Sequence, residues 1–197
     1  MEITAKMVKE LRDKTGAGMM DCKGALGEAG GDMEKAVKIL REKGIAKAAK
    51  KVGRETSEGA VVAYIHPGDK LGVLVEVACE TDFVARTDQF KTFARDVAMH
   101  IAASNPVCVR REDIDPKLVE GERDIFRKMA EKEGKPEKII DKIVDGKIEK
   151  FYSESVLLEQ PYVKDTDKSV KQYLDETVGS LGENIMIKRF TRFRLGE

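Results

Sequence analysis

The chain has 197 residues, enough for one full hydrophobic core and a small additional domain. Basic and acidic side chains balance at 36 each, so no overall field favours nucleic acid or an anionic membrane. No apolar run approaches the roughly 20 residues of a membrane span, and the first ten residues lack the apolar centre of a secretory signal. The three cysteines have no Cys-x-x-Cys spacing, which fits a reducing cytosol better than a disulfide framework. We therefore expect a cytoplasmic protein with no membrane segment.

Residues 1–54 have the pattern of three short helices. Apolar side chains recur at helical spacing in three stripes: Ile3, Met7, Val8 and Leu11; Cys22, Ala25, Leu26 and Ala29; Met33, Ala36, Val37 and Leu40. Glycines at 16 and 18 separate the first two helices, and the run Gly30-Gly31-Asp32 is typical of one helix ending and the next beginning. The segment carries thirteen Lys and Arg against eight Asp and Glu, a charge of +5. This charge favours an acidic protein face, although a solvated helical surface accounts for most of it.

Residues 45–51 contain good helix formers and almost no large apolar side chain. This composition predicts an exposed helical linker. We therefore place a domain boundary near Arg54, with an N-terminal helical domain over residues 1–54 and a second domain over residues 55–197.

Beyond residue 55 the pattern changes to period two. Residues 61–66 alternate, Pro67-Gly68-Asp69-Lys70 is a turn signal, and Leu71–Cys79 returns as a mostly apolar strand, so a hairpin is predicted. The spacing of apolar residues from Phe90 to Ile101 then predicts an amphipathic helix that ends at Asn105-Pro106.

The remaining elements are two charged helices at about 116–133 and 136–151, a helix at about 169–181 and a closing strand at 184–195. The predicted fold class is α+β: a three-helix bundle followed by a core of antiparallel sheet covered by helices. A sheet of about three strands has little area and exposed edges, so pairing with a second copy of the chain is expected.

Candidate catalytic groups are few. His66 and His100 each lack an orienting partner, as a catalytic base would need. Cys79 with His66 would make a nucleophile and base on neighbouring strands, but nothing local lowers the pKa of the thiol. Glu80 and Asp82 share strand parity, yet without a third ligand they indicate a solvated strand end rather than a metal or acid–base site. No phosphate-binding glycine motif is present, so the sequence predicts no enzyme, no cofactor and no metal.

Two places carry large apolar side chains that a small core cannot fully accept. Met19 and Met20 are adjacent on a helix and point about 100° apart, so at least one should be exposed. Exposed methionine offers an adaptable contact to a partner. Phe83, at the exit of a strand, either packs beneath the helix of Phe90 or stands exposed as a side chain that a partner pocket could bury.

Five segments carry motifs of one known family. They are residues 11–26, Glu76–Ala85, His100–Ala103, Gln160–Val163 and Gly182–Ile185. With them nearly the whole chain resembles elongation factor Ts, the guanine-nucleotide exchange factors of bacterial translation, in their short form with one core module. Gly24 departs from the family pattern, which usually has a larger, often basic residue there. Tyr162 is a milder departure, at a position where Phe is common.

The resemblance implies an N-terminal bundle of the UBA-like type, a homodimer, and a factor that binds elongation factor Tu in its GDP-bound and nucleotide-free states. It implies no direct contact with nucleic acid or membrane. The residues expected to dock the G domain of the partner are Arg12, Met19, Met20 and Lys23.

The resemblance also implies a role for the turn after the second predicted strand, near the magnesium and phosphate of the partner's nucleotide. The residues concerned are Thr81, Asp82, Phe83, Val84 and Arg86. Phe83 would insert between partner side chains, and Asp82 would make polar contacts beside it. GDP would leave because the ligands of its magnesium ion are disturbed.

Two other functions stay open from the sequence. One is a plain binding module, in which the three-helix unit recognises a peptide or a ubiquitin-like surface and the core only dimerises. The other is a thiol enzyme at Cys79.

Overall fold

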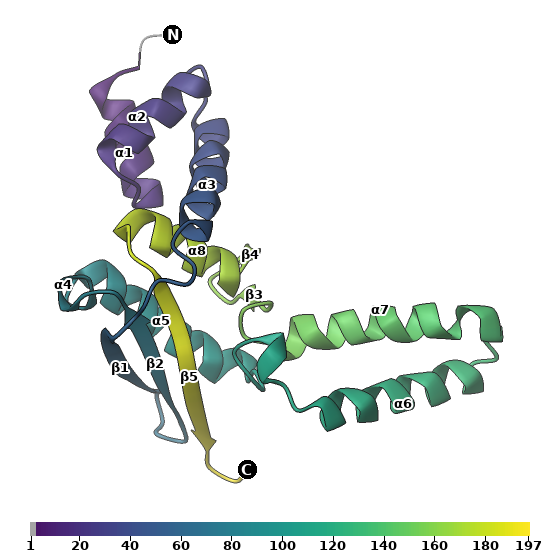
Figure 1. The fold of residues 1–197 in the computed structure, drawn as a ribbon. Helices are drawn as coiled ribbons and strands as arrows, with labels where there is room; N and C mark the ends of the chain where they lie inside the picture. Colours follow the sequence, from purple (N-terminus) through teal and green to yellow (C-terminus); the bar gives the residue numbers. More distant parts are fainter. Residues whose placement is uncertain (1–2) are drawn as a thin grey trace. The chain divides into compact units, whose positions relative to one another are not determined.

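The computed structural model describes residues 3–197, and Figure 1 shows the order of its elements. The α-helices are α1 (Ala5–Thr15), α2 (Met19–Glu28), α3 (Met33–Ala49), α4 (Asp82–Ala85), α5 (Asp88–Ser104), α6 (Pro116–Lys132), α7 (Glu137–Ser155) and α8 (Val170–Leu181). The strands are β1 (Glu58–Ile65), β2 (Leu71–Cys79), β3 (Pro161–Tyr162), β4 (Asp165–Ser169) and β5 (Ile185–Arg194), and a 3-10 turn covers Arg111–Asp113. Within residues 3–197, no helix is long and apolar enough to cross a bilayer.

The chain divides into two compact units, each assembled from separate stretches. The first contains residues up to Val61, 76–94 and 172–186; the second contains residues 62–75, 95–171 and 187–197. Strands β1, β2 and β5 form a three-stranded sheet in the order β1-β2-β5, and each of these strands has residues in both units. The α+β class predicted from the sequence is confirmed, whereas the domain boundary near Arg54 stays a prediction.

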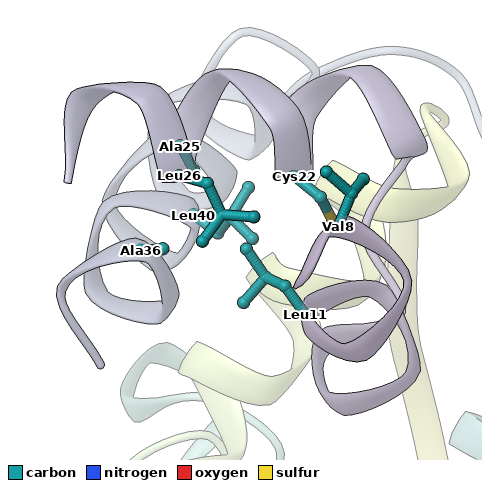
Figure 2. Close-up of a cluster of buried hydrophobic side chains, with 7 residues drawn as sticks. All are labelled: Val8, Leu11, Cys22, Ala25, Leu26, Ala36 and Leu40. Carbon is teal, nitrogen blue, oxygen red and sulfur yellow. The ribbon is translucent and has the colours of Figure 1, made fainter. Parts of the chain in front are cut away.

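The first unit contains the three-helix bundle that the sequence predicts. Its core consists of seven buried side chains, shown in Figure 2: Val8, Leu11, Cys22, Ala25, Leu26, Ala36 and Leu40. Helix α1 begins where the Thr4 hydroxyl accepts the N–H of Met7 at 3.3 Å, and α3 begins where the Asp32 carboxylate accepts the N–H of Lys35 at 3.1 Å. Gly16, with φ of 68°, ends α1 in the left-handed conformation that glycine adopts most readily.

The expected helical linker at residues 45–51 is helical as far as Ala49, and its side chains are mostly exposed. Ala48 is buried, at 4% exposed. Just before this stretch α3 comes close to α8, because a Cβ added at Gly179 would lie 2.9 Å from the Cα of Gly44. Two helices meet this closely only where both lack side chains. The end of α3 therefore approaches α8 within the first unit, and its role as a linker between domains stays a prediction.

In the second unit, α6 and α7 lie side by side as a helical hairpin (Figure 1). They are the two charged helices of the sequence, and they bury a small core of their own: Ala130, Ile140, Val144 and Ile148. Arg123 pairs with Asp145 at 2.8 Å across the hairpin, and Arg127 pairs with Asp141. The contacts that the sequence left open for these helices are thus made largely with each other.

The second unit also holds a small antiparallel sheet, β3 with β4, that the sequence analysis did not predict. Its register pairs Pro161 with Ser169 and Tyr162 with Asp165. The hydroxyl of Tyr162 donates to buried Asp96 on α5 at 2.9 Å, which fixes the sheet to that helix. A polar strand of five residues gives no hydrophobic alternation, so a sequence pattern could not reveal it.

Candidate functional site

The turn after β2 is a capped single turn of helix. Strand β2 ends at Cys79, and the hydroxyl of Thr81 accepts the N–H of Val84 at 3.4 Å, which makes Thr81 the N-cap of α4. The turn closes where the N–H of Arg86 donates to the carbonyl of Asp82 at 3.1 Å. A threonine in the extended conformation at this position is a preferred helix start. The strand therefore leads directly into a helical turn that presents its side chains outward.

Phe83 stands on this turn with 80% of its surface exposed. The alternative in which it packs beneath the helix of Phe90 is wrong, because Phe90 is itself fully buried and α4 contains no buried residue. Asp82 and Arg86 lie one helical turn apart and form an ion pair at 2.8 Å with both side chains in solvent. Phe83 is thus a large apolar side chain left mostly in solvent beside two charged residues.

Residues from far along the chain anchor the turn. The Glu183 carboxylate accepts the N–H of Thr81 at 3.0 Å and its hydroxyl at 2.7 Å. In the opposite direction, the Glu80 carboxylate accepts the N–H of Asn184 at 2.6 Å. The thiol of Cys79 donates to the carbonyl of Thr81 at 3.1 Å. All of these residues belong to the first unit.

Glu80 is not the solvated strand end that the sequence suggested. Its side chain is 22% exposed, and it lies between the N–H of Asn184 and the guanidinium of Arg54 at 3.5 Å. The hydrogen bond from Asn184, followed by the charge of Arg54, holds the pKa of Glu80 below its usual value. Asn184 in turn donates its side-chain amide to the carbonyl of Arg54 at 2.8 Å. The carboxylate of Glu80 thus serves to join segments of the first unit.

Sequence reasoning missed Glu183 and Asn184 as residues of the site. Their one signal was membership of the Gly182–Ile185 segment that resembles the family. Gly182, with φ of 77°, takes the chain out of α8 in a left-handed turn. That turn places Glu183 and Asn184 immediately before β5, which is the neighbour of β2 in the sheet.

The second set of predicted contact residues lies on the bundle. Met19 is 46% exposed and Met20 is 78% exposed, so the expectation that at least one faces solvent is confirmed. Arg12 on α1 and Lys23 on α2 are also exposed. Cys22, which lies on α2 between Met20 and Lys23, is fully buried. The bundle core therefore holds the two methionines outward without including them.

A short chain of hydrogen bonds connects the loop beside these methionines with the start of α5. The hydroxyl of Ser180 on α8 donates to the carbonyl of Gly16 at 2.9 Å, and the amide of Gln89 donates to the oxygen of Ser180 at 2.9 Å. Gln89 is the second residue of α5, directly after the turn that carries Phe83. Both sets of predicted contact residues consequently belong to one compact unit and are connected through α8.

The groups considered for catalysis are used structurally. Burial raises the pKa of the Cys79 thiol, and the nearby charge of Glu183 raises it further, so the sulfur stays protonated. His100 is fully buried, and burial lowers its pKa. Its Nδ1 accepts the N–H of Val163 at 3.2 Å, which leaves Nε2 to donate to Gln160 at 2.9 Å. Both nitrogens of this neutral ring are therefore occupied by the fold.

A metal site has no support in the described part of the chain. Among residues 3–197, no three His, Cys, Asp or Glu side chains are grouped so that they could hold a metal ion. What the arrangement offers instead is contact: an exposed aromatic on a rigid turn and two exposed methionines on a bundle, all in one unit.

Comparison with known proteins defines the class. The sequence profile of the family described as "Elongation factor TS" matches residues 4–197, and the chain belongs to this family. An elongation factor Ts of Desulfosudis oleivorans is 62% identical over 195 residues, covering 99% of this chain and 98% of that protein. One of Alkaliphilus oremlandii is 61% identical over 197 residues, covering 100% and 91%. One of Carboxydothermus hydrogenoformans is 60% identical over 195 residues, covering 99% and 90%.

Proposed function

We propose that this protein binds elongation factor Tu and promotes release of GDP from it during translation elongation, without catalysing a chemical reaction. The observation that carries the proposal is Phe83, 80% exposed on an anchored single turn in a member of the elongation factor Ts family. Burial of such a side chain in a partner stabilises a complex by roughly 1.5–3 kcal/mol. It is also the kind of aromatic anchor that dominates binding energy at protein interfaces.

In this proposal the two exposed sets divide the work. Arg12, Met19, Met20 and Lys23 hold the G domain of the partner, and the adaptable methionines provide most of the apolar contact. Docking there brings the turn of α4 to the nucleotide site.

At the nucleotide site, Phe83 inserts between partner side chains while Asp82 makes polar contacts beside it. Thr81, Val84 and Arg86 complete the turn. The ligands of the partner's magnesium ion are thereby disturbed, and the phosphates of GDP are held less tightly.

The energetics of exchange need only differential binding. The factor must bind the empty partner more tightly than the GDP-bound partner, and by linkage it weakens GDP by the same ratio. Such couplings are commonly about 1–3 kcal/mol, and expelling a tightly held nucleotide requires at least this much. Either GTP or GDP then enters according to its concentration, so no bond-making residue is required.

The test is the dissociation rate of fluorescent GDP from elongation factor Tu, with and without this protein. A rate that rises with the amount of protein, at far less than one molecule per partner, supports exchange. Binding to the partner with no acceleration would favour the plain binding module instead. A Cys79→Ala variant with full exchange activity would dispose of the thiol enzyme.

We further propose that residues 55–197 dimerise, as the family resemblance implies. In the second unit, four exposed apolar side chains line or border one hollow on β1, β2 and β5: Ile65, Leu74, Phe193 and Leu195, between 45% and 77% exposed. Contiguous apolar surface of this kind is rarely left to solvent. Sedimentation of a Phe193→Lys variant beside the unaltered protein tests this, since the variant should be monomeric at micromolar concentration. A monomer for the unaltered protein would contradict the proposal.

The proposed partner and reaction place the protein in the cytoplasm, with no contact to nucleic acid or membrane of its own. The balanced charge of 36 basic and 36 acidic residues agrees with this, because it gives no overall field that favours nucleic acid or an anionic membrane.

A further inference from the structure

Glu183 and Glu80 form a reciprocal clamp between the end of β2 and the start of β5. Glu183 accepts the N–H of Thr81 at 3.0 Å, while Glu80 accepts the N–H of Asn184 at 2.6 Å. Each carboxylate therefore binds the backbone of the residue that follows the other carboxylate. We call the four residues Glu80, Thr81, Glu183 and Asn184 the reciprocal clamp.

From the clamp we infer that Glu183 is a positioning residue for GDP release: it holds Thr81, and through Thr81 the turn that presents Phe83. This inference rests on the proposed function of the turn. Glu183 is not one of the residues proposed to contact the partner, and it acts on the turn through its two hydrogen bonds with Thr81.

The first argument is that α4 cannot hold its own geometry. It has four residues, from Asp82 to Ala85, and none of them is buried. A single helical turn fixes many backbone torsions for very few hydrogen bonds, so it is unstable alone. Something outside the turn must keep it in place if Phe83 is to enter a partner as a rigid group.

The second argument is where the outside bonds fall. Every polar atom of Thr81 is engaged: its N–H and its hydroxyl donate to Glu183, its Oγ1 accepts the N–H of Val84, and its carbonyl accepts the thiol of Cys79. Because the hydroxyl hydrogen points to Glu183, the lone pairs of Oγ1 are directed toward Val84. Glu183 thus orients the same hydroxyl that caps the turn.

The third argument concerns strength. The two bonds from Thr81 to Glu183 end on a carboxylate, and charge-assisted hydrogen bonds are about twice as strong as neutral ones. Removing the carboxylate leaves the hydroxyl free to rotate and the part-buried N–H of Thr81 without its acceptor. The expected result is a turn that opens and closes, with Phe83 moving through several directions.

The experiment compares fluorescent GDP release from elongation factor Tu for Glu183→Ala, Phe83→Ala and the double variant. The matched control is Glu55→Gln, an exposed carboxylate of the first unit outside the clamp. At saturating protein, Glu183→Ala should release GDP about tenfold more slowly, the scale expected for losing a charge-assisted hydrogen bond. The protein concentration for half-maximal effect should change by less than about threefold, because the docking residues are elsewhere.

Two readouts separate positioning from general damage. In the double variant, Glu183→Ala should add less than about twofold to the loss from Phe83→Ala, since a clamp for Phe83 has nothing left to position. Hydrogen exchange should show faster exchange at Thr81 and Val84 with unchanged protection in the bundle core around Leu26. Should Glu183→Ala fold poorly, Glu183→Gln replaces it, because it removes the charge and keeps the size of the side chain. It should also slow release, and in the Phe83→Ala background it should add less than about twofold.

The two proposals fail in different ways. A slow Phe83→Ala beside a Glu183→Ala with the parental rate overturns the inference alone. If the two effects on the release rate multiply in the double variant, the inference is also overturned, because Glu183 would then act independently of Phe83. A parental rate for Phe83→Ala overturns the proposed role of the turn and removes the inference with it.

Discussion

The first unit has two sets of exposed apolar side chains, Met19 with Met20 and Phe83, and different kinds of contact hold them in place. Met19 and Met20 lie on the ten-residue helix α2, and Cys22 of the same helix packs into the apolar core of the bundle. Phe83 lies on a four-residue helix without buried residues, and the residue that caps this helix, Thr81, is held by the carboxylate of Glu183, 102 positions away in sequence. The methionines are positioned by apolar packing of their helix, whereas the turn of Phe83 is positioned by a few specific hydrogen bonds. In the proposed function the methionines dock the partner and Phe83 disturbs its nucleotide site, and the second role needs a more rigidly held side chain than the first.

The largest effect should come from Phe83→Ala. A side chain at the centre of an interface is worth at least about 2 kcal/mol when removed, which slows GDP release about 30-fold. The free energy of unfolding should stay within about 0.5 kcal/mol, because surface substitutions away from structural contacts are nearly neutral and Phe83 is 80% exposed. Stopped-flow release and thermal unfolding measure the two quantities.

The control for Phe83→Ala is Val52→Ala, which shortens another exposed apolar side chain of the same unit, 74% exposed. It should change neither quantity. A large fall in melting temperature for Phe83→Ala would mean that the aromatic side chain stabilises the fold. Phe83 could then no longer be contrasted with the methionines as a side chain held only by the turn.

The double substitution Met19→Ala with Met20→Ala should act on docking instead of release. Losing two partly buried methionine contacts should raise the half-maximal concentration about tenfold, while the release rate at saturation stays near that of the parent. Met129→Ala on α6 is the matched control, since this methionine is 44% exposed. If stability collapsed while affinity for the partner stayed the same, the two methionines would be core residues after all.

Periodic patterns made the bundle predictable from the sequence. Leu11, Leu26 and Leu40 each belong to an apolar stripe at helical spacing on its own helix, and each is buried in the core of the bundle. The same reasoning predicted that at least one of Met19 and Met20 is exposed, whereas for Phe83 it left exposure and packing beneath the helix of Phe90 both open. Local information of this kind lies within one helix or one turn, so a single sequence contains it.

Long-range contacts were the part that the sequence could not supply. The clamp joins Thr81 to Glu183 across 102 residues, and nothing in either segment alone reveals the pairing. The close approach of Gly44 on α3 to Gly179 on α8 is likewise a contact that neither segment reveals alone. A glutamate at a strand end is expected to be solvated when its hydrogen-bond partner is unknown. For this reason the prediction that Glu80 is solvated was wrong.

A smaller effect is expected from Gly24→Ala, which tests whether the bundle surface is independent of bundle stability. Gly24 lies inside α2, and an added Cβ would meet nothing within 4 Å. Alanine should therefore stabilise the protein by about 0.5–1 kcal/mol through helix propensity. Denaturant unfolding measures this, and GDP release should be unchanged. Weaker docking with higher stability would show that the partner needs the backbone of α2 to be open at this point.

The smallest effect should appear on acidification, and it should be confined to the clamp. The pKa of Glu80 is lowered in the folded state by the N–H of Asn184 and by Arg54, so its contribution is present above the unfolded pKa of about 4.3 and is lost as pH falls through the folded value. In the bundle, the N–H of Lys35 lowers the pKa of Asp32 as well, but Asp32 is exposed at the start of α3 and lies outside the core around Leu26. Hydrogen exchange should be measured between pH 5 and pH 3, about one unit either side of the unfolded carboxyl pKa. As the pH falls, the amide of Asn184 should lose protection before that of Leu26. A Glu80→Gln variant should already be loose at pH 5 and should lose this pH dependence. If the clamp and the bundle core lost protection at the same pH, they would unfold in one cooperative transition. The two sets of exposed side chains would then differ only in how the residues around them pack.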